Sequence, residues 1–114
     1  MFSLLVLAAQ ATSSVPTQSS EFMPLMDDYR GCVIANAATF EDAKEPVKDT
    51  VEASFAACKS ERARIILMMN AKKKPDGSER WPLDRADRFV ADLIDKPLAD
   101  KITTSLFAER ARAK

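Results

Sequence analysis

Residues 29–62 read YRGCVIANAATFEDAKEPVKDTVEASFAACKSER, and this stretch decides the fold. On each side of the central EDAKEP, apolar residues recur at three- and four-residue spacing, which is the pattern of an amphipathic helix. Pro46 suits the first turn of the second helix, because the N–H group that proline lacks would have no partner there. The stretch therefore predicts two helices that fold back on each other as an antiparallel hairpin.

Cys32 and Cys58 are the only cysteines of the chain, and both lie on the predicted apolar stripes. If the hairpin turns about residues 44 and 45, residues equally far from the turn face each other, as these two cysteines do. We therefore predict a Cys32–Cys58 disulfide, which would stabilise the hairpin by about 3.5 kcal/mol through loop-closure entropy. Two buried free thiols are one alternative, and a redox-active pair, which usually has C-x-x-C spacing, is another.

The same register predicts further contacts across the hairpin. It places Phe40 near Val51 and Asp28 near Arg62. Arg62 lies on an otherwise apolar face, where a carboxylate partner would satisfy its guanidinium group. A structural ion pair between Asp28 and Arg62 is therefore expected.

The helical pattern continues past this stretch, and the second helix is predicted to run from Pro46 to about Met69. Residues 70–81 contain three lysines and a Pro-Asp-Gly turn, which indicate a loop. Pro82 can begin a third helix, and Pro97 is expected to end it, because proline interrupts the hydrogen bonding of a helix.

A fourth helix is expected from Leu98, and no strand-like alternation of useful length is present. The predicted fold class is therefore all-α: a small bundle of three to four helices, in residues 24–114, built on a disulfide-stapled antiparallel helical hairpin. The predicted core comprises Leu25, Tyr29, Cys32, Val33, Asn36, Ala37, Phe40, Val47, Val51, Phe55, Cys58, Arg62, Ile65, Ile66, Met69, Leu83, Ala86, Phe89, Val90, Leu93, Ile94, Ile102, Leu106 and Phe107.

The N-terminus predicts export. Residues 2–9 read FSLLVLAA, an uncharged apolar run that suits a signal peptide and is too short to span a bilayer. Cleavage is expected after Ala11, although the usual basic residues before the apolar run are missing. Residues 1–11 are thus predicted to be a signal peptide and residues 12–23 a flexible linker, with no transmembrane segment after cleavage. The alternative is an N-terminal core helix.

Composition excludes several function classes. Seventeen basic and seventeen acidic residues give no net charge, so no overall field attracts nucleic acid. The chain has no histidine, the commonest general base and a common metal ligand, and only two glycines, too few for a nucleotide-binding loop. We therefore expect no enzyme activity, no nucleic-acid partner, no cofactor and no metal site.

Three groups of residues deserve separate interpretation. The expected partner contacts are on and beside the loop, namely Lys72, Lys73, Lys74, Arg80 and Trp81. Solvated loop charge and a core tryptophan are the alternatives. Four methionines, at positions 23, 26, 68 and 69, could hold Cu(I), but core packing is favoured because no histidine or free thiolate assists. Four aspartates, at 84, 87, 92 and 95, are interpreted as an ion-pair ladder on a solvated face rather than a Ca²⁺ site.

Tyr29-x-x-Cys32, the alanine-rich hairpin, and Ala57-Cys58 with Arg62 four residues on carry a resemblance. In these features the chain resembles functionally uncharacterised two-cysteine helical proteins exported by Gram-negative bacteria. The resemblance covers the hairpin only, and it implies a periplasmic or secreted location, where disulfides persist. Periplasmic acid-stress chaperones are similar in size and in having a helical fold with one disulfide. No residue motif is shared with them, so this is an analogy between classes of protein.

Two functions are therefore expected. The first is a non-enzymatic periplasmic interaction module whose partner is another envelope protein, bound through residues 72–81 and the grooves between helices. The second is an acid-responsive periplasmic chaperone, whose carboxylates lose charge at low pH and loosen ion pairs such as Asp28–Arg62.

Overall fold

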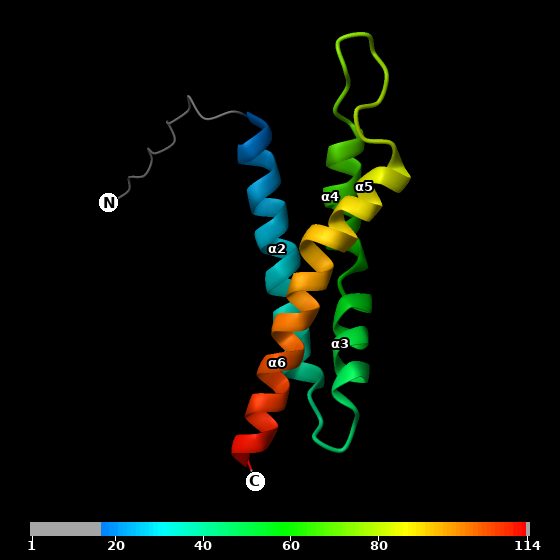
Figure 1. Cartoon of the computed structure of the whole chain (residues 1–114). Coiled ribbons are helices and arrows are strands. Elements are labelled where there is room, and N and C mark those ends of the chain that lie inside the picture. Colours follow the sequence, from blue (N-terminus) through cyan, green and yellow to red (C-terminus); the bar gives the residue numbers. More distant parts are fainter. Residues whose placement is uncertain (1–16, 114) are drawn as a thin grey trace, which may run out of the picture.

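The computed structural model describes residues 17–113, which are almost entirely helical (Figure 1). The predicted signal peptide and the start of the predicted linker lie outside the described residues. The elements are the α-helices α2 (Thr17–Phe40), α3 (Val47–Ala56), α4 (Lys59–Asn70), α5 (Leu83–Val90) and α6 (Lys96–Ala113), with a π-helical turn, η1 (Ala91–Asp95), between the last two. Among these residues the only β-bridge joins Lys73 and Glu79.

The predicted hairpin is confirmed. Helix α2 runs antiparallel to α3 and α4, and both of them pack on it (Figure 1). The chain reverses between α2 and α3, where the Glu45 N–H donates to the Asp42 carbonyl at 2.9 Å. Cys32 and Cys58 form a disulfide whose Cα atoms lie 6.1 Å apart. The disulfide therefore confirms the inferred register at Cys32 and Cys58, whereas the predicted approach of Phe40 to Val51 stays a prediction.

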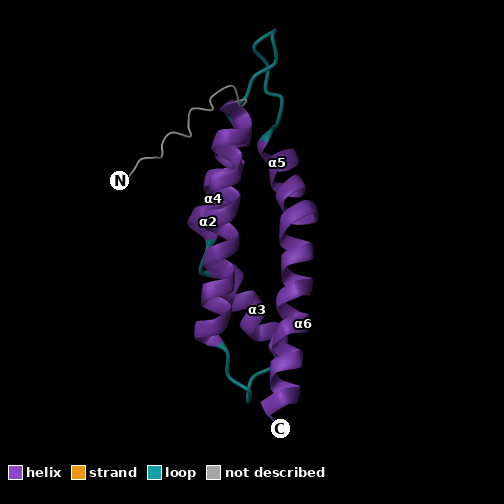
Figure 2. Cartoon of the chain, turned by 90° about the vertical axis from the view of Figure 1, so that its left-hand side faces the viewer, coloured by secondary structure: helices purple, strands orange, loops and turns teal. Residues whose placement is uncertain are grey.

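The remaining helices form a C-terminal arm, defined as residues 83–113. One end of the arm, α5, packs on α4, and the other end, α6, packs mainly on α3 and touches α2 lightly. Figure 2 shows α5 and α6 continuing as one rod beside the hairpin, with α3 reaching across to α6. The molecule is therefore a small helical bundle in which the hairpin supplies one side and the arm the other.

The core lies between hairpin and arm. Its completely enclosed side chains include Tyr29, Val33, Cys58, Ile65 and Val90. Most of the predicted core positions are buried or partly buried, and Leu98 joins them. Four predicted core residues are instead exposed, because no helix covers their side of the bundle: Phe40, Leu83, Leu93 and Phe107.

The predicted second helix is divided in two, which corrects the expectation of one helix from Pro46 to Met69. The Cys58 N–H donates to the Phe55 carbonyl three residues earlier, at 3.0 Å, so the last turn tightens and α3 ends. Cys58 then leaves helical geometry, with φ −113° and ψ 27°, and precedes α4. The break thus falls at the residue that the disulfide ties to α2.

Pro97 does not end the third helix, as was expected, but lies in the first turn of α6. It has no N–H to bond the carbonyl of Leu93, four residues earlier. The helix accommodates this loss by widening just before the proline, where the Lys96 N–H donates to the Ala91 carbonyl, five residues earlier. The arm therefore stays continuous through η1.

Helix α2 begins at Thr17, earlier than the start near Pro24 that we expected, so part of the predicted linker is helical. Pro24 lies inside this helix, where its missing N–H removes a single hydrogen bond. Phe22 packs against the core and compensates with apolar contact. This longer helix brings Phe22 to the end of the bundle from which the loop projects.

Candidate functional site

One cavity lies where α2, α4, α5 and the loop of residues 71–82 meet. We call it the groove, and its volume is about 380 Å³. It is lined by Phe22, Met68, Met69, Lys72, Arg80, Trp81 and Phe89. Aromatic rings and methionines thus form the walls, and two basic side chains lie among them.

Trp81 forms a well-supported wall of the groove. Its backbone carbonyl accepts a hydrogen bond from Asn70 Nδ2 at 2.8 Å, which ties the start of α5 to the end of α4. Its ring meets Phe89 edge to face, with centroids 5.2 Å apart, and the Arg85 guanidinium lies 5.9 Å from the ring centroid. The Trp81 ring is therefore partly buried and partly open to the groove. It has features of both interpretations, the core tryptophan and the partner contact.

The loop is a short ordered ribbon. The Lys74 N–H donates to the Ser78 carbonyl at 2.9 Å, and Gly77 takes φ 90°, a conformation that favours glycine. Asp76 accepts hydrogen bonds from both the backbone N–H and the hydroxyl of Ser78, and these bonds lower the pKa of its carboxyl. The loop therefore presents its charges from a defined backbone.

The predicted contact residues are only partly brought together. Lys72, Arg80 and Trp81 line the groove, and Arg80 also lines a shallow depression with Lys74. Lys73 forms an ion pair with Glu79 at 3.8 Å, on the ribbon itself. Sequence reasoning missed Phe22 and Phe89, because their meeting with Trp81 depends on how distant helices pack.

The methionines are distributed as packing residues. Met69 is buried, Met26 packs against the core, and Met68 lies in the groove wall. Met23 is half exposed on α2. This arrangement supports the interpretation of methionine as core filler and makes Met68 a flexible part of an apolar surface.

A second cluster, the Arg62 network, joins the hairpin to the arm. Arg62 Nε donates to Asp95 Oδ2 at 2.8 Å, and its Nη1 donates to Asp87 Oδ1 at 2.6 Å. The buried Tyr29 hydroxyl donates to the other oxygen of Asp95 at 2.5 Å. Three helical segments and η1 thus meet in one chain of hydrogen bonds.

This network corrects the predicted Asp28–Arg62 pair. Asp28 is exposed on α2, and Arg62 points toward the arm instead. Two aspartates of the predicted surface ladder, Asp87 and Asp95, are its actual partners. Asp92 of the predicted ladder does form an ion pair on the arm, with its Oδ1 3.4 Å from Lys96 Nζ.

Both hydrogen-bond donors of the network have raised pKa values. Burial raises the pKa of the Tyr29 hydroxyl, and its hydrogen bond to Asp95 raises that pKa further. Tyr29 therefore remains a protonated donor at all physiological pH values. Arg62 lies in a position where burial opposes its charge, but its bonds to Asp87 and Asp95 outweigh this effect and raise its pKa.

A second charged contact holds the far end of the arm. Arg110 donates from Nε and Nη2 to the two carboxylate oxygens of Glu41, at 2.7 and 2.9 Å. A third bond, at 2.8 Å, reaches the Asp42 carbonyl in the hairpin turn. The hydrogen bonds from Arg110 keep the pKa of Glu41 below its usual value. Charged pairs therefore hold the arm near both of its ends.

The comparisons with known proteins add no assignment. No protein-family model, curated protein or solved structure matches the chain. Among the described helices, none combines the length and the apolar character needed to cross a membrane.

Proposed function

We propose that this chain is an exported, non-enzymatic interaction protein of the bacterial envelope, and that the groove binds an acidic segment of another envelope protein. The groove is the single observation that carries this proposal. Its walls offer Trp81, Phe89 and Phe22, and aromatic residues, methionine and arginine are the residue types enriched in protein interfaces. A partner with one apolar side chain could place it between these rings.

Charge complementarity favours an acidic partner. The acidic side chains near the groove are occupied, because Asp76 accepts from Ser78, Glu79 pairs with Lys73, and Asp87 pairs with Arg62. Arg80 and Lys74 are exposed and line a depression together beside the groove. Carboxylates of a bound segment would meet these cations at the rim, where they improve specificity and association rate more than affinity.

Export rests on the N-terminal apolar run and on the disulfide. Disulfides persist in oxidising compartments and are rare in the cytosol. The Cys32–Cys58 bond therefore supports a periplasmic or secreted location, together with the predicted cleavage after Ala11. N-terminal sequencing of the protein from the periplasm should find Thr12 as the first residue, and full-length protein in the cytoplasm would contradict export.

Peptide binding can be followed through Trp81, the only tryptophan. The probe is a synthetic peptide with a leucine anchor flanked by glutamates, and its control has glutamine at every glutamate. We expect the acidic peptide to shift Trp81 emission at lower concentration than the neutral one. Arg80→Glu should abolish that preference, whereas Lys48→Glu, at an exposed site on α3, should preserve it.

The other possible results of this binding experiment would each contradict the proposal in a different way. Equal binding of both peptides would refute the role of charge, and no binding of either would refute the groove as a peptide site. An emission change that depends only on protein concentration would assign the groove to a second copy of this chain. A response to anionic vesicles and not to peptides would assign it to a membrane surface.

An acid-responsive chaperone is the second candidate, favoured by the charged pairs that hold the arm. Carboxylates are largely protonated at pH 2 to 3, so Glu41 would then lose its attraction to Arg110. Release of the arm would expose the apolar faces of Val90, Ile94 and Ile102. Those faces could bind unfolded proteins.

This candidate is tested by measuring aggregation of an acid-denatured client protein near pH 2.5, together with binding of a hydrophobic dye. We expect suppression of aggregation and increased dye binding as the pH falls. Glu41→Gln, which resembles the protonated side chain, should shift the onset of dye binding to higher pH. A protein that keeps its folded near-UV spectrum and protects no client would eliminate the chaperone hypothesis.

A further inference from the structure

The surroundings of the disulfide contain a third group that can ligate a metal. Glu61 is the third residue of α4, one helical turn after Cys58 at the start of that helix. At this position a glutamate side chain reaches back toward the residue that precedes the helix. A carboxylate oxygen of Glu61 and the sulfurs of Cys32 and Cys58 all lie within 4.8 Å of one another.

We propose that the reduced form of this protein binds Zn²⁺ through Cys32, Cys58 and Glu61, so that the disulfide and the zinc site are alternative closures of the same hairpin. Thiolates and carboxylates are both established zinc ligands, and three protein ligands leave the fourth position open for water. The proposal does not depend on the groove.

The geometry suits one zinc ion. Two thiolates that bind zinc tetrahedrally at about 2.3 Å lie about 3.8 Å apart, so the sulfurs must separate when the disulfide is broken. The two Cα atoms are 6.1 Å apart. Rotation of the side chains can open the sulfurs to this distance while the two helices keep their positions.

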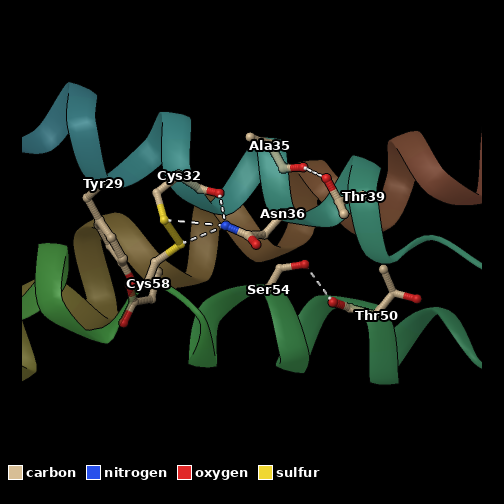
Figure 3. Close-up of a disulfide and its surroundings, with 9 residues drawn as sticks. Tyr29, Cys32, Ala35, Asn36, Thr39, Thr50, Ser54 and Cys58 are labelled. Atoms are coloured by element: carbon tan, nitrogen blue, oxygen red, sulfur yellow. Dashed lines mark hydrogen bonds between the residues drawn. A yellow bond between two sulfur atoms is a disulfide. The ribbon is translucent and has the colours of Figure 1, made fainter.

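Asn36 supplies the polar surroundings that such a site needs. Its Nδ2 lies 3.5 Å from each sulfur and donates to the Cys32 carbonyl at 2.9 Å, so the amide is held with its donor toward both sulfurs (Figure 3). A hydrogen-bond donor stabilises thiolates and orients metal ligands. Cys58 also lies at the N-terminus of α4, whose dipole favours a thiolate over a thiol.

Access to the disulfide differs between its two sulfurs. Cys58 is completely buried, whereas Cys32 is partly exposed. A dithiol reductant can therefore attack at Cys32, which makes Cys58 the leaving thiolate.

The redox balance is complete. A dithiol transfers two electrons to the disulfide, and it becomes a disulfide itself while Cys32 and Cys58 become thiols. Binding of Zn²⁺ then displaces two protons from these thiols, and water occupies the open position. Oxidation by an acceptor disulfide removes two electrons, re-forms the Cys32–Cys58 bond and releases the ion.

The test uses the full chain, reduced with a dithiol and then freed of it without oxygen. Co²⁺ serves as the spectroscopic probe, and Zn²⁺ competes with it. We expect one Co²⁺ per reduced chain, with a thiolate-to-cobalt charge-transfer band, and displacement by Zn²⁺. The oxidised protein should give no such band.

Variants separate the ligands from general effects. Glu61→Gln should weaken Zn²⁺ binding at least about tenfold, since loss even of an outer-shell partner has effects of that size. Glu45→Gln, at an exposed site in the hairpin turn, is the matched control and should leave the affinity unchanged. Asn36→Ala should weaken binding less than Glu61→Gln.

If reduction loosens the fold, helicity becomes the second readout. Zn²⁺ should then restore helical circular dichroism and raise the Tm of the reduced wild type, but not of the Cys32→Ser/Cys58→Ser protein. Absence of both metal binding and refolding would overturn the proposal. So would Co²⁺ binding that is equal in oxidised and reduced protein, or equal affinity in Glu61→Gln and Glu45→Gln.

Discussion

The hairpin and the C-terminal arm are held by different physics. The hairpin has a covalent bond and a continuous apolar seam, with Val33, Cys58 and Ile65 completely enclosed. The arm contributes apolar residues of its own, but charged contacts join it to the hairpin near both ends, through Arg62 and Arg110. The hairpin should therefore respond to redox conditions and the arm to pH.

The comparison also explains why contacts within the hairpin are easier to predict from the sequence than contacts of the arm. Cys32 and Cys58 are 26 residues apart and related by one turn. Arg62 and Asp95 are 33 residues apart, and Arg110 and Glu41 are 69 apart. Contacts across one turn follow from helix periodicity, whereas these longer contacts depend on how the arm crosses the hairpin.

Removing the disulfide is the largest expected perturbation. Cys32→Ser/Cys58→Ser should lower the free energy of unfolding by about 3.5 kcal/mol, because the unfolded chain gains loop entropy. Chemical denaturation monitored by circular dichroism measures this loss. A decrease below about 1 kcal/mol would mean that the unfolded chain is already compact around the hairpin.

Breaking the Arg62 network should have the next largest effect. Arg62→Ala should destabilise the protein by about 2–3 kcal/mol, since it leaves Asp95 without its cation in a partly buried position. Arg64→Ala, an exposed change on the same helix, is the control and should stay within about 0.5 kcal/mol. Asp28→Asn should be equally mild, and a large effect there would revive the ion pair expected from the hairpin register.

The pH response of the arm is a finer test. Because Arg110 lowers the pKa of Glu41, this pair contributes stability above the ordinary glutamate pKa, and the contribution is lost as pH falls through the lowered value. Glu41→Gln should therefore be less stable than wild type at pH 7, and the difference should vanish at strongly acidic pH. Denaturation midpoints at a series of pH values measure it, and a difference that persists at pH 2 would exclude this linkage.

Leu93 in η1 gives the smallest predicted effect, and its buried neighbour Ile94 provides the contrast. Leu93 is 60% exposed, so Leu93→Ala should change the free energy of unfolding by no more than about 0.5 kcal/mol. Ile94 is 3% exposed, and Ile94→Ala should cost about 2 kcal/mol or more. Equal losses at the two positions would show that the π-helical turn does not set the face that the arm buries.

The hairpin could be predicted because its signals are local and mutually consistent. The apolar stripes, Pro46 and the two cysteines all imply the same register. The breaks within helices were harder to predict. Pro97 was expected to end a helix, yet the wider turn of η1 absorbs it, and Pro24 lies inside α2. Each proline removes only one hydrogen bond, and packing on neighbouring helices outweighs that loss.

The candidate sites also combine residues that the sequence indicates with residues that only packing brings together. Lys72, Arg80 and Trp81 were identified from composition and position, because charge and an aromatic ring beside a turn are visible in the sequence. Phe22 and Phe89 were not, since each looks like an ordinary core residue until α2 and α5 are placed. Glu61 was missed as well, because its approach to the sulfurs depends on where α3 ends and α4 begins.

The sequence by itself determined the all-helical fold, the antiparallel hairpin and the partners in the disulfide, because these follow from the 3.6-residue period and one turn. Only the tertiary structure decided which carboxylates Arg62 and Arg110 meet, and which aromatic side chains surround Trp81. The physical reason is that a charged or aromatic side chain on a helix surface has several possible partners of similar energy. The packing of the arm on the hairpin selects among them.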